Sequence, residues 1–235
     1  MKNGAETKRK VSFALNVAIA LFSFLGVLLA CIFARRDGYS SWDKRLLYFT
    51  QQSNIWIGVT GLLVALSSFA KLRGKPVPFE NALGLAKYVF TVAITITGLI
   101  FCALLAPFAE YNVWSFSSVL THVAVPVLSI VDFCCFYKSG RETELERKHV
   151  FLPLLPPLFY FVFAGALCLA KVDFGRGDAF PYFFMDFYSE AGFFGFINSS
   201  PPQLGTAYWL VFMLLLVLGF SYLYYRISKR KQNKA

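Results

Sequence analysis

The sequence predicts an all-α fold, namely a polytopic integral membrane protein built as a bundle of six transmembrane helices. Of its 235 residues, 57% are hydrophobic and only 15% are charged, whereas soluble domains contain about 25% charged residues. Six apolar runs are each long enough to cross a bilayer, which takes about 20 residues in a helix. Because backbone groups in hydrocarbon must find partners within their own segment, each run is expected to be helical. We expect one membrane domain over residues 1–235, since no stretch remains for a soluble domain.

Three spans are expected in the first half of the chain. The first, residues 11–34, follows a basic leader, and its apolar run is too long for the core of a signal peptide. The second covers residues 46–70 and follows a short outer loop. The third covers residues 84–106 after a turn-rich connection, and it carries Lys87 near its cytoplasmic end. We expect this lysine to extend its ammonium group to the membrane interface.

Three more spans are expected in the second half, at residues 114–137, 150–170 and 205–225. The fifth span opens with three prolines, which should bend its helix or delay its start. The outer loop 171–204 separates the last two spans and contains ten Phe or Tyr residues. Aromatic residues at this density are typical of the membrane interface. The loop is therefore expected either to form a lid or lipid-facing surface, or to rest on the bilayer.

The positive charge predicts the orientation of the chain and requires no nucleic-acid partner. Alternating the loops between two sides places sixteen of the 23 Lys and Arg residues on the side of the N-terminus and six on the other. Short cytoplasmic loops carry such an excess, so both termini are expected to be cytoplasmic. Both a bacterial plasma membrane and a eukaryotic endomembrane or plasma membrane fit these features.

Neither a metal nor another cofactor is expected. The five cysteines fall in apolar spans, their number is odd, and no pair has zinc-ligand spacing with nearby histidines. We interpret them as small buried hydrophobic residues. They are Cys31, Cys102, Cys134, Cys135 and Cys168.

A polar cluster near the start of the second span is the most informative feature of the chain. Five consecutive polar residues, Thr50 to Asn54, lie within a segment that is otherwise apolar. Polar side chains in hydrocarbon destabilise a protein unless they find partners in it or in a wet cavity. The cluster is therefore expected to form one wall of a buried site.

The fourth span offers a partner for this cluster in His122. If both helices begin at their outer ends, Thr50 and His122 lie about 6 and 12 Å below the rim. Boundaries predicted from sequence are uncertain by about 2–4 residues, which can remove this offset. An imidazole has an unperturbed pKa near neutrality and suits a general base. The pair is thus a candidate hydroxyl nucleophile activated by a histidine.

The neighbours of Thr50 are candidates for supporting roles. Asn54 shares its helix face and Ser53 lies nearby, so both, with Gln51, could support a substrate or oxyanion or hold the pair. Asp132 is about 15 Å along the helix from His122, and we expect it to be structural or capping. The sequence therefore predicts a catalytic dyad without a carboxylate.

These residues resemble a known family. The run Tyr48-Phe49-Thr50 with Asn54, and His122 with Pro126, look like the androgen-induced and androgen-dependent TFPI-regulating membrane proteins and their bacterial relatives. The resemblance implies a small polytopic hydrolase of fatty acid esters of hydroxy fatty acids. It implies Thr50 as the nucleophile and His122 as the base.

The favoured hypothesis is an intramembrane lipid ester hydrolase whose partners are membrane lipids and a lipid ester substrate. Acyl transfer to another lipid alcohol is a close variant. A small transporter or channel is the alternative from another class, with a polar path lined by the Thr50–Asn54 cluster and His122. A scaffold whose polar cluster only joins helices is a third possibility.

Overall fold

The computed structural model describes residues 2–77, 79–109, 113–136, 145–198 and 203–233. Six of its helical segments are long and apolar enough to cross a membrane, which confirms the expected number. The first three segments are α1 (Lys2–Ile32), α2 (Phe49–Leu72) and α3 (Glu80–Ile100), which the π-helical turn η2 (Phe101–Leu105) continues. The fourth segment consists of α4 (Phe116–Val119), η4 (Leu120–Ala124), α5 (Val125–Val131) and η5 (Asp132–Phe136). The fifth consists of η6 (Arg147–Leu154) and α6 (Leu155–Leu169), and the sixth is α7 (Thr206–Asn233).

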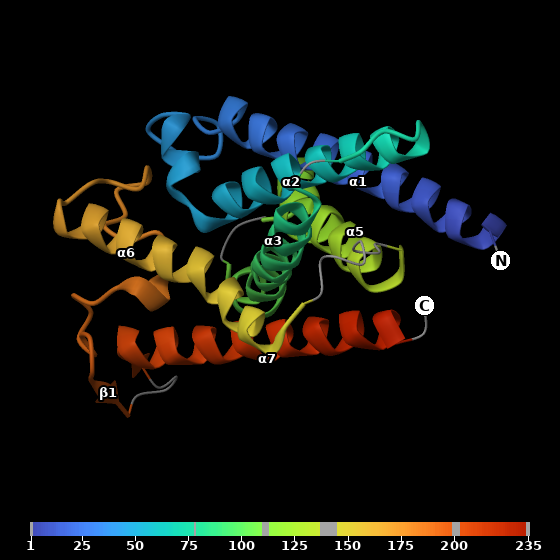
Figure 1. Cartoon of the computed structure of the whole chain (residues 1–235). Coiled ribbons are helices and arrows are strands. Elements are labelled where there is room, and N and C mark those ends of the chain that lie inside the picture. Colours follow the sequence, from blue (N-terminus) through green and yellow to red (C-terminus); the bar gives the residue numbers. More distant parts are fainter. Residues whose placement is uncertain (1, 78, 110–112, 137–144, 199–202, 234–235) are drawn as a thin grey trace.

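Helix α3 lies at the centre of the bundle (Figure 1). In the most apolar 18-residue stretch of this segment, 61% of the residues are buried inside the protein. The corresponding share is 17% for α7, which lies at the periphery. The pair α1 and α2 packs on one side of α3, and α7 lies on the other. Both termini lie at one end of the bundle and the 171–204 loop at the opposite end (Figure 1).

Close packing of α1 on α2 depends on a small residue. A Cβ atom on Gly61 would lie 3.1 Å from the backbone oxygen of Asn16 in α1 and 3.2 Å from the Ile19 side chain. Small residues let the backbones of membrane helices approach closely. The glycine therefore allows the polar groups of α1 to reach the core of the bundle.

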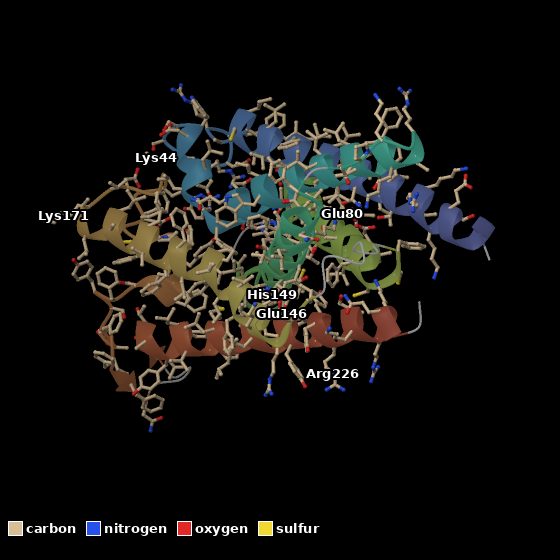
Figure 2. The ribbon with its side chains drawn as sticks, in the orientation of Figure 1. Lys44, Glu80, Glu146, His149, Lys171 and Arg226 are labelled. Atoms are coloured by element: carbon tan, nitrogen blue, oxygen red, sulfur yellow. The ribbon has the colours of Figure 1, made fainter. Side chains whose placement is uncertain are left out.

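The prolines of the fifth span delay its helix, as expected. Residues Arg147–Leu154, which include Pro153, form a 3₁₀ helix, and the α-helix begins at Leu155. Figure 2 shows Glu146 and His149 beside each other at the start of η6. There the His149 ring accepts a hydrogen bond from the Glu146 amide at 3.0 Å, so this histidine caps a helix.

The 171–204 loop contains the only strands in the described part of the chain. Strand β1 (Phe196–Ile197) pairs antiparallel with β2 (Gln203–Leu204), a small departure from the expected all-α fold. Lys44 and Lys171 mark this end of the bundle (Figure 2). The Lys44 ammonium donates to the backbone oxygen of Asp173 at 2.8 Å, which ties the loop to the segment before α2.

The expectation that Lys87 extends to the interface is wrong. Its side chain is fully buried, and Nζ lies 2.9 Å from Oδ2 of Asp132, which is fully buried too. Lys87 also donates to Asn16 at 2.8 Å, while Asn16 and Ser12 donate to the carboxylate at 2.7 and 2.6 Å. A charged side chain can stay buried in the protein when an opposite charge pairs with it. The four residues of this cluster join α1, α3 and η5. Asp132 has the structural role that was expected.

Most of the cysteines are not buried, contrary to our interpretation. Cys168 is buried, but Cys102 and Cys135 are exposed on the outer surface and the other two are partly exposed. A position within a predicted span indicates apolar surroundings. It does not indicate whether the side chain faces the protein interior or the lipid.

Candidate active site

The structure brings Thr50 and His122 together. Thr50 lies in the first turn of α2, and His122 lies in the π-helical turn η4, 72 residues away. The distance from Thr50 Oγ1 to His122 Nε2 is 3.2 Å. This is the separation at which an imidazole can take a proton from a hydroxyl nucleophile.

A backbone carbonyl orients the imidazole. His122 Nδ1 lies 3.0 Å from the carbonyl oxygen of Ser118. The Ser118 and Thr121 hydroxyls also lie 3.1 and 3.2 Å from Nδ1, and a hydroxyl can donate or accept. Because the carbonyl can only accept, this contact favours the tautomer with the hydrogen on Nδ1, in which Nε2 accepts from the Thr50 hydroxyl. The Ser118 carbonyl thus takes the position that a carboxylate holds in a triad. The π-helical turn is the kind of local distortion that recurs at functional sites.

Packing fixes the plane and depth of the histidine ring. The Phe101 ring stacks on it with centroids 3.7 Å apart and an interplanar angle of 17°. A Cβ atom on Gly98 would lie 2.8 Å from the backbone oxygen of His122 and 2.9 Å from Pro126. Glycine at this point of α3 therefore lets the segment that carries His122 approach closely.

Asn54 and Ser53 hold the first turn of α2 in place and do not point free donors at the nucleophile. The Asn54 amide group donates to the backbone oxygens of Thr50 at 2.8 Å and Thr121 at 3.1 Å, so it connects the two segments of the pair. The Ser53 hydroxyl contacts the Thr50 backbone oxygen and, at 2.8 Å, the hydroxyl of Thr97 in α3. Their geometry therefore favours positioning over contact with an oxyanion.

Gln51 takes no comparable part in these contacts. Its side chain is buried, and its oxygen Oε1 has no hydrogen-bond partner among the residues that the structure describes. An amide oxygen can only accept a hydrogen bond, so this atom cannot stabilise an oxyanion. The geometry gives Gln51 no defined role at the pair.

An apolar cavity of about 100 Å³ lies beside Thr50. Its lining comes from α2, α3, η2, α6, α7 and the 171–204 loop, whereas His122 is not part of it. Thr50 is therefore the member of the pair that faces the cavity. The apolar residues around it include Phe49, Ile100, Phe161, Trp209, Leu210 and Met213.

Two tyrosines near Thr50 were not among the candidates from sequence. Tyr182, from the aromatic loop, and Tyr160, from α6, both line the cavity with Thr50. Burial raises the pKa of Tyr182 to about 12, although hydrogen bonding to the Thr50 side chain and to the amides of Thr50 and Phe49 lowers it. The phenol thus stays protonated at neutral pH. The loop covers the site, which favours the lid over the alternative of a loop that only rests on the bilayer.

No group of three or more His, Cys, Asp or Glu side chains that could hold a metal ion occurs among the described residues. Comparisons with protein-family models, with curated proteins and with solved structures found no match to this chain. The described part of the chain is a bundle of six apolar helical segments, in which the Thr50 member of a hydroxyl–imidazole pair faces an apolar cavity.

Proposed function

We propose that this chain is a multi-pass membrane enzyme that hydrolyses lipid esters, with Thr50 as nucleophile and His122 as general base. The observation that carries the proposal is the 3.2 Å contact between Thr50 Oγ1 and His122 Nε2 at the wall of an apolar cavity. A helix-joining contact does not need a cavity beside it. A nucleophile does, because the acyl group must reach it.

The reaction has two halves. Thr50 Oγ attacks the ester carbonyl carbon while its proton moves to His122 Nε2. The tetrahedral adduct collapses, the bond to the alcohol oxygen breaks, and His122 returns the proton to that oxygen. Water then attacks the acyl-threonine and gives its proton to His122. The acyl bond to Thr50 breaks, Thr50 Oγ recovers the proton, and a carboxylic acid leaves.

The cavity supports a substrate with a hydrocarbon chain. Helices α6 and α7 both contribute apolar residues to the lining. A hydrocarbon chain bound in this cavity reaches Thr50 through apolar surroundings. The resemblance to hydrolases of fatty acid esters of hydroxy fatty acids names the substrate class, and transfer to a lipid alcohol is the variant in which that alcohol replaces water.

The charge distribution supports cytoplasmic termini. The aromatic loop and the first turn of α2 then lie toward the opposite, outer face, because the loop lies at the end of the bundle away from the termini (Figure 1). Substrate would enter from the outer half of the bilayer.

The test is hydrolysis of a branched hydroxy-fatty-acid ester by the purified full chain in detergent. Thr50→Ala should lower kcat by about 10³-fold or more, because the nucleophile is lost, while Thr50→Ser should retain part of it. Thr60→Ala is the matched control, since Thr60 is a buried threonine of α2 whose hydroxyl contacts only the Trp56 backbone oxygen at 2.8 Å among the described contacts.

Three outcomes discriminate between the hypotheses. Full activity in Thr50→Ala, or no hydrolysis of any lipid ester by the wild type, contradicts the hydrolase. Ion or solute flux in liposomes that survives Thr50→Ala would favour a transporter or channel. A loss of thermal stability without either activity would favour a scaffold.

A further inference from the structure

The hydroxyl of Tyr160 is a buried polar group that makes no well-aligned hydrogen bond to the residues that the structure describes. Tyr160 lies in α6, and only 5% of its surface is exposed. Its Oη atom makes no well-aligned hydrogen bond among the described residues, although the Phe49 backbone and the Tyr182 hydroxyl lie close enough to interact with it. Buried hydroxyls are nearly always hydrogen-bonded, so this one is a donor that the folded chain leaves available. It lines the same cavity as Thr50.

The first turn of α2 offers further donors at the same place. The amides of Phe49 and Thr50 belong to the N-terminal turn, where no acceptor exists within the helix. The positive end of the helix dipole also favours negative charge there. The Tyr160 ring packs against the Phe49 ring with centroids 5.2 Å apart, which brings α6 to this turn.

An oxygen atom already occupies the space beside these amides. The Tyr182 hydroxyl interacts with the amides of Phe49 and Thr50 and with the Thr50 side chain. The rings of Tyr160 and Tyr182 lie with centroids 6.2 Å apart. An oxygen atom therefore fits beside these amides, and a substrate oxygen would take the place of the Tyr182 hydroxyl there, next to the Tyr160 phenol.

We propose that the Tyr160 hydroxyl and the amides of Phe49 and Thr50 bind the carbonyl oxygen of the acyl substrate. This inference rests on the proposed function. When Thr50 Oγ bonds to the carbonyl carbon, the carbonyl π electrons move to its oxygen, and the threonine proton goes to His122. The three donors stabilise the resulting oxyanion without transferring a proton, and they release it when the alcohol leaves.

Tyr160→Phe is the decisive variant because it removes one oxygen atom and keeps the ring. Loss of one such donor should lower kcat by about 10²-fold or more, with KM changed by less than about threefold because the donor acts mainly in the transition state. The melting temperature should change little, since the removed hydroxyl makes no well-aligned hydrogen bond among the described residues.

Tyr224→Phe is the matched control. Tyr224 is buried, its hydroxyl lies 2.8 Å from the Thr95 hydroxyl, and it does not line the cavity. This variant should melt at a lower temperature and keep the wild-type kcat. A loss of kcat equal to that of Tyr160→Phe would mean that any lost tyrosine hydroxyl perturbs the bundle, and it would overturn the inference.

A long-chain alkyl trifluoromethyl ketone gives a second readout, because its adduct with Thr50 carries an oxyanion. Its affinity should fall in Tyr160→Phe by about the same factor as kcat/KM. If Tyr160→Phe keeps full kcat and full affinity while Thr50→Ala is inactive, the proposed function stands and the oxyanion site is wrong. If the wild type neither hydrolyses esters nor forms the adduct at Thr50, both fall.

Discussion

The bundle holds two polar clusters that differ in how completely they are satisfied. The first, which we call the inner cluster, consists of Ser12, Asn16, Lys87 and Asp132. Both carboxylate oxygens of Asp132 accept hydrogen bonds there, and the Lys87 ammonium contacts both Asp132 and Asn16. The second, the outer cluster, is the Thr50–His122 pair beside the cavity, together with the Tyr160 hydroxyl, which makes no well-aligned hydrogen bond among the described residues.

The difference teaches how structural and functional polarity can be told apart inside an apolar bundle. Charges enclosed by protein must be matched completely, because an unpaired buried charge strongly destabilises the fold. A buried neutral group that lacks a hydrogen bond destabilises the fold less than an unpaired buried charge does. Unused hydrogen-bonding capacity beside a cavity therefore marks the outer cluster as the place where a ligand fits.

The largest expected effect concerns the histidine of the outer cluster. His122→Gln should lower kcat for ester hydrolysis by about 10²- to 10⁴-fold, because glutamine cannot act as the general base. His149→Gln is the matched control, since His149 caps η6 away from the pair. Equal activity in the two variants would remove the functional distinction between the clusters.

A smaller effect, on stability, is expected in the inner cluster. Asp132→Ala leaves the Lys87 ammonium buried without its counter-ion and should lower the free energy of unfolding by about 3–5 kcal/mol. The double variant Lys87→Met/Asp132→Leu should recover most of this loss. Denaturation of the protein in detergent measures both, and kcat per folded molecule should stay near the wild-type value.

Loss of activity in the folded double variant would contradict the separation of roles. It would mean that the ion pair acts on the outer site as well as on the fold. Full stability of Asp132→Ala would show that the pair is not the structural element we describe.

The smallest effect is expected at Gly98, where α3 packs closely against the segment that carries His122. A methyl group at Gly98 would press on the His122 backbone and on Pro126, so Gly98→Ala should destabilise the fold by about 1–3 kcal/mol and lower kcat. Gly165→Ala is the control, because no atom lies within 4 Å of a Cβ there and alanine favours the helix by up to about 1 kcal/mol. Thermal melting and kcat of both variants test whether this close approach sets the 3.2 Å contact.

The sequence by itself determined the six helical segments, because the length of an apolar run limits what can cross a bilayer. It also singled out Thr50 and His122, because polar side chains within apolar spans are energetically costly and are often functional. The delayed start of α6 followed in the same way from its prolines.

Only the tertiary structure decided which groups meet. The Lys87–Asp132 pair depends on the rotation and depth of two helices. The Ser118 carbonyl that orients His122 has no signature in sequence, because every residue carries a carbonyl. Tyr160 is one of 12 tyrosines in a chain that also has 27 phenylalanines. The residues around it in the sequence are apolar like those around many of the others, so the sequence does not single it out. A sequence encodes how much each residue resists burial in hydrocarbon, whereas the partner of a buried group is set by packing in three dimensions.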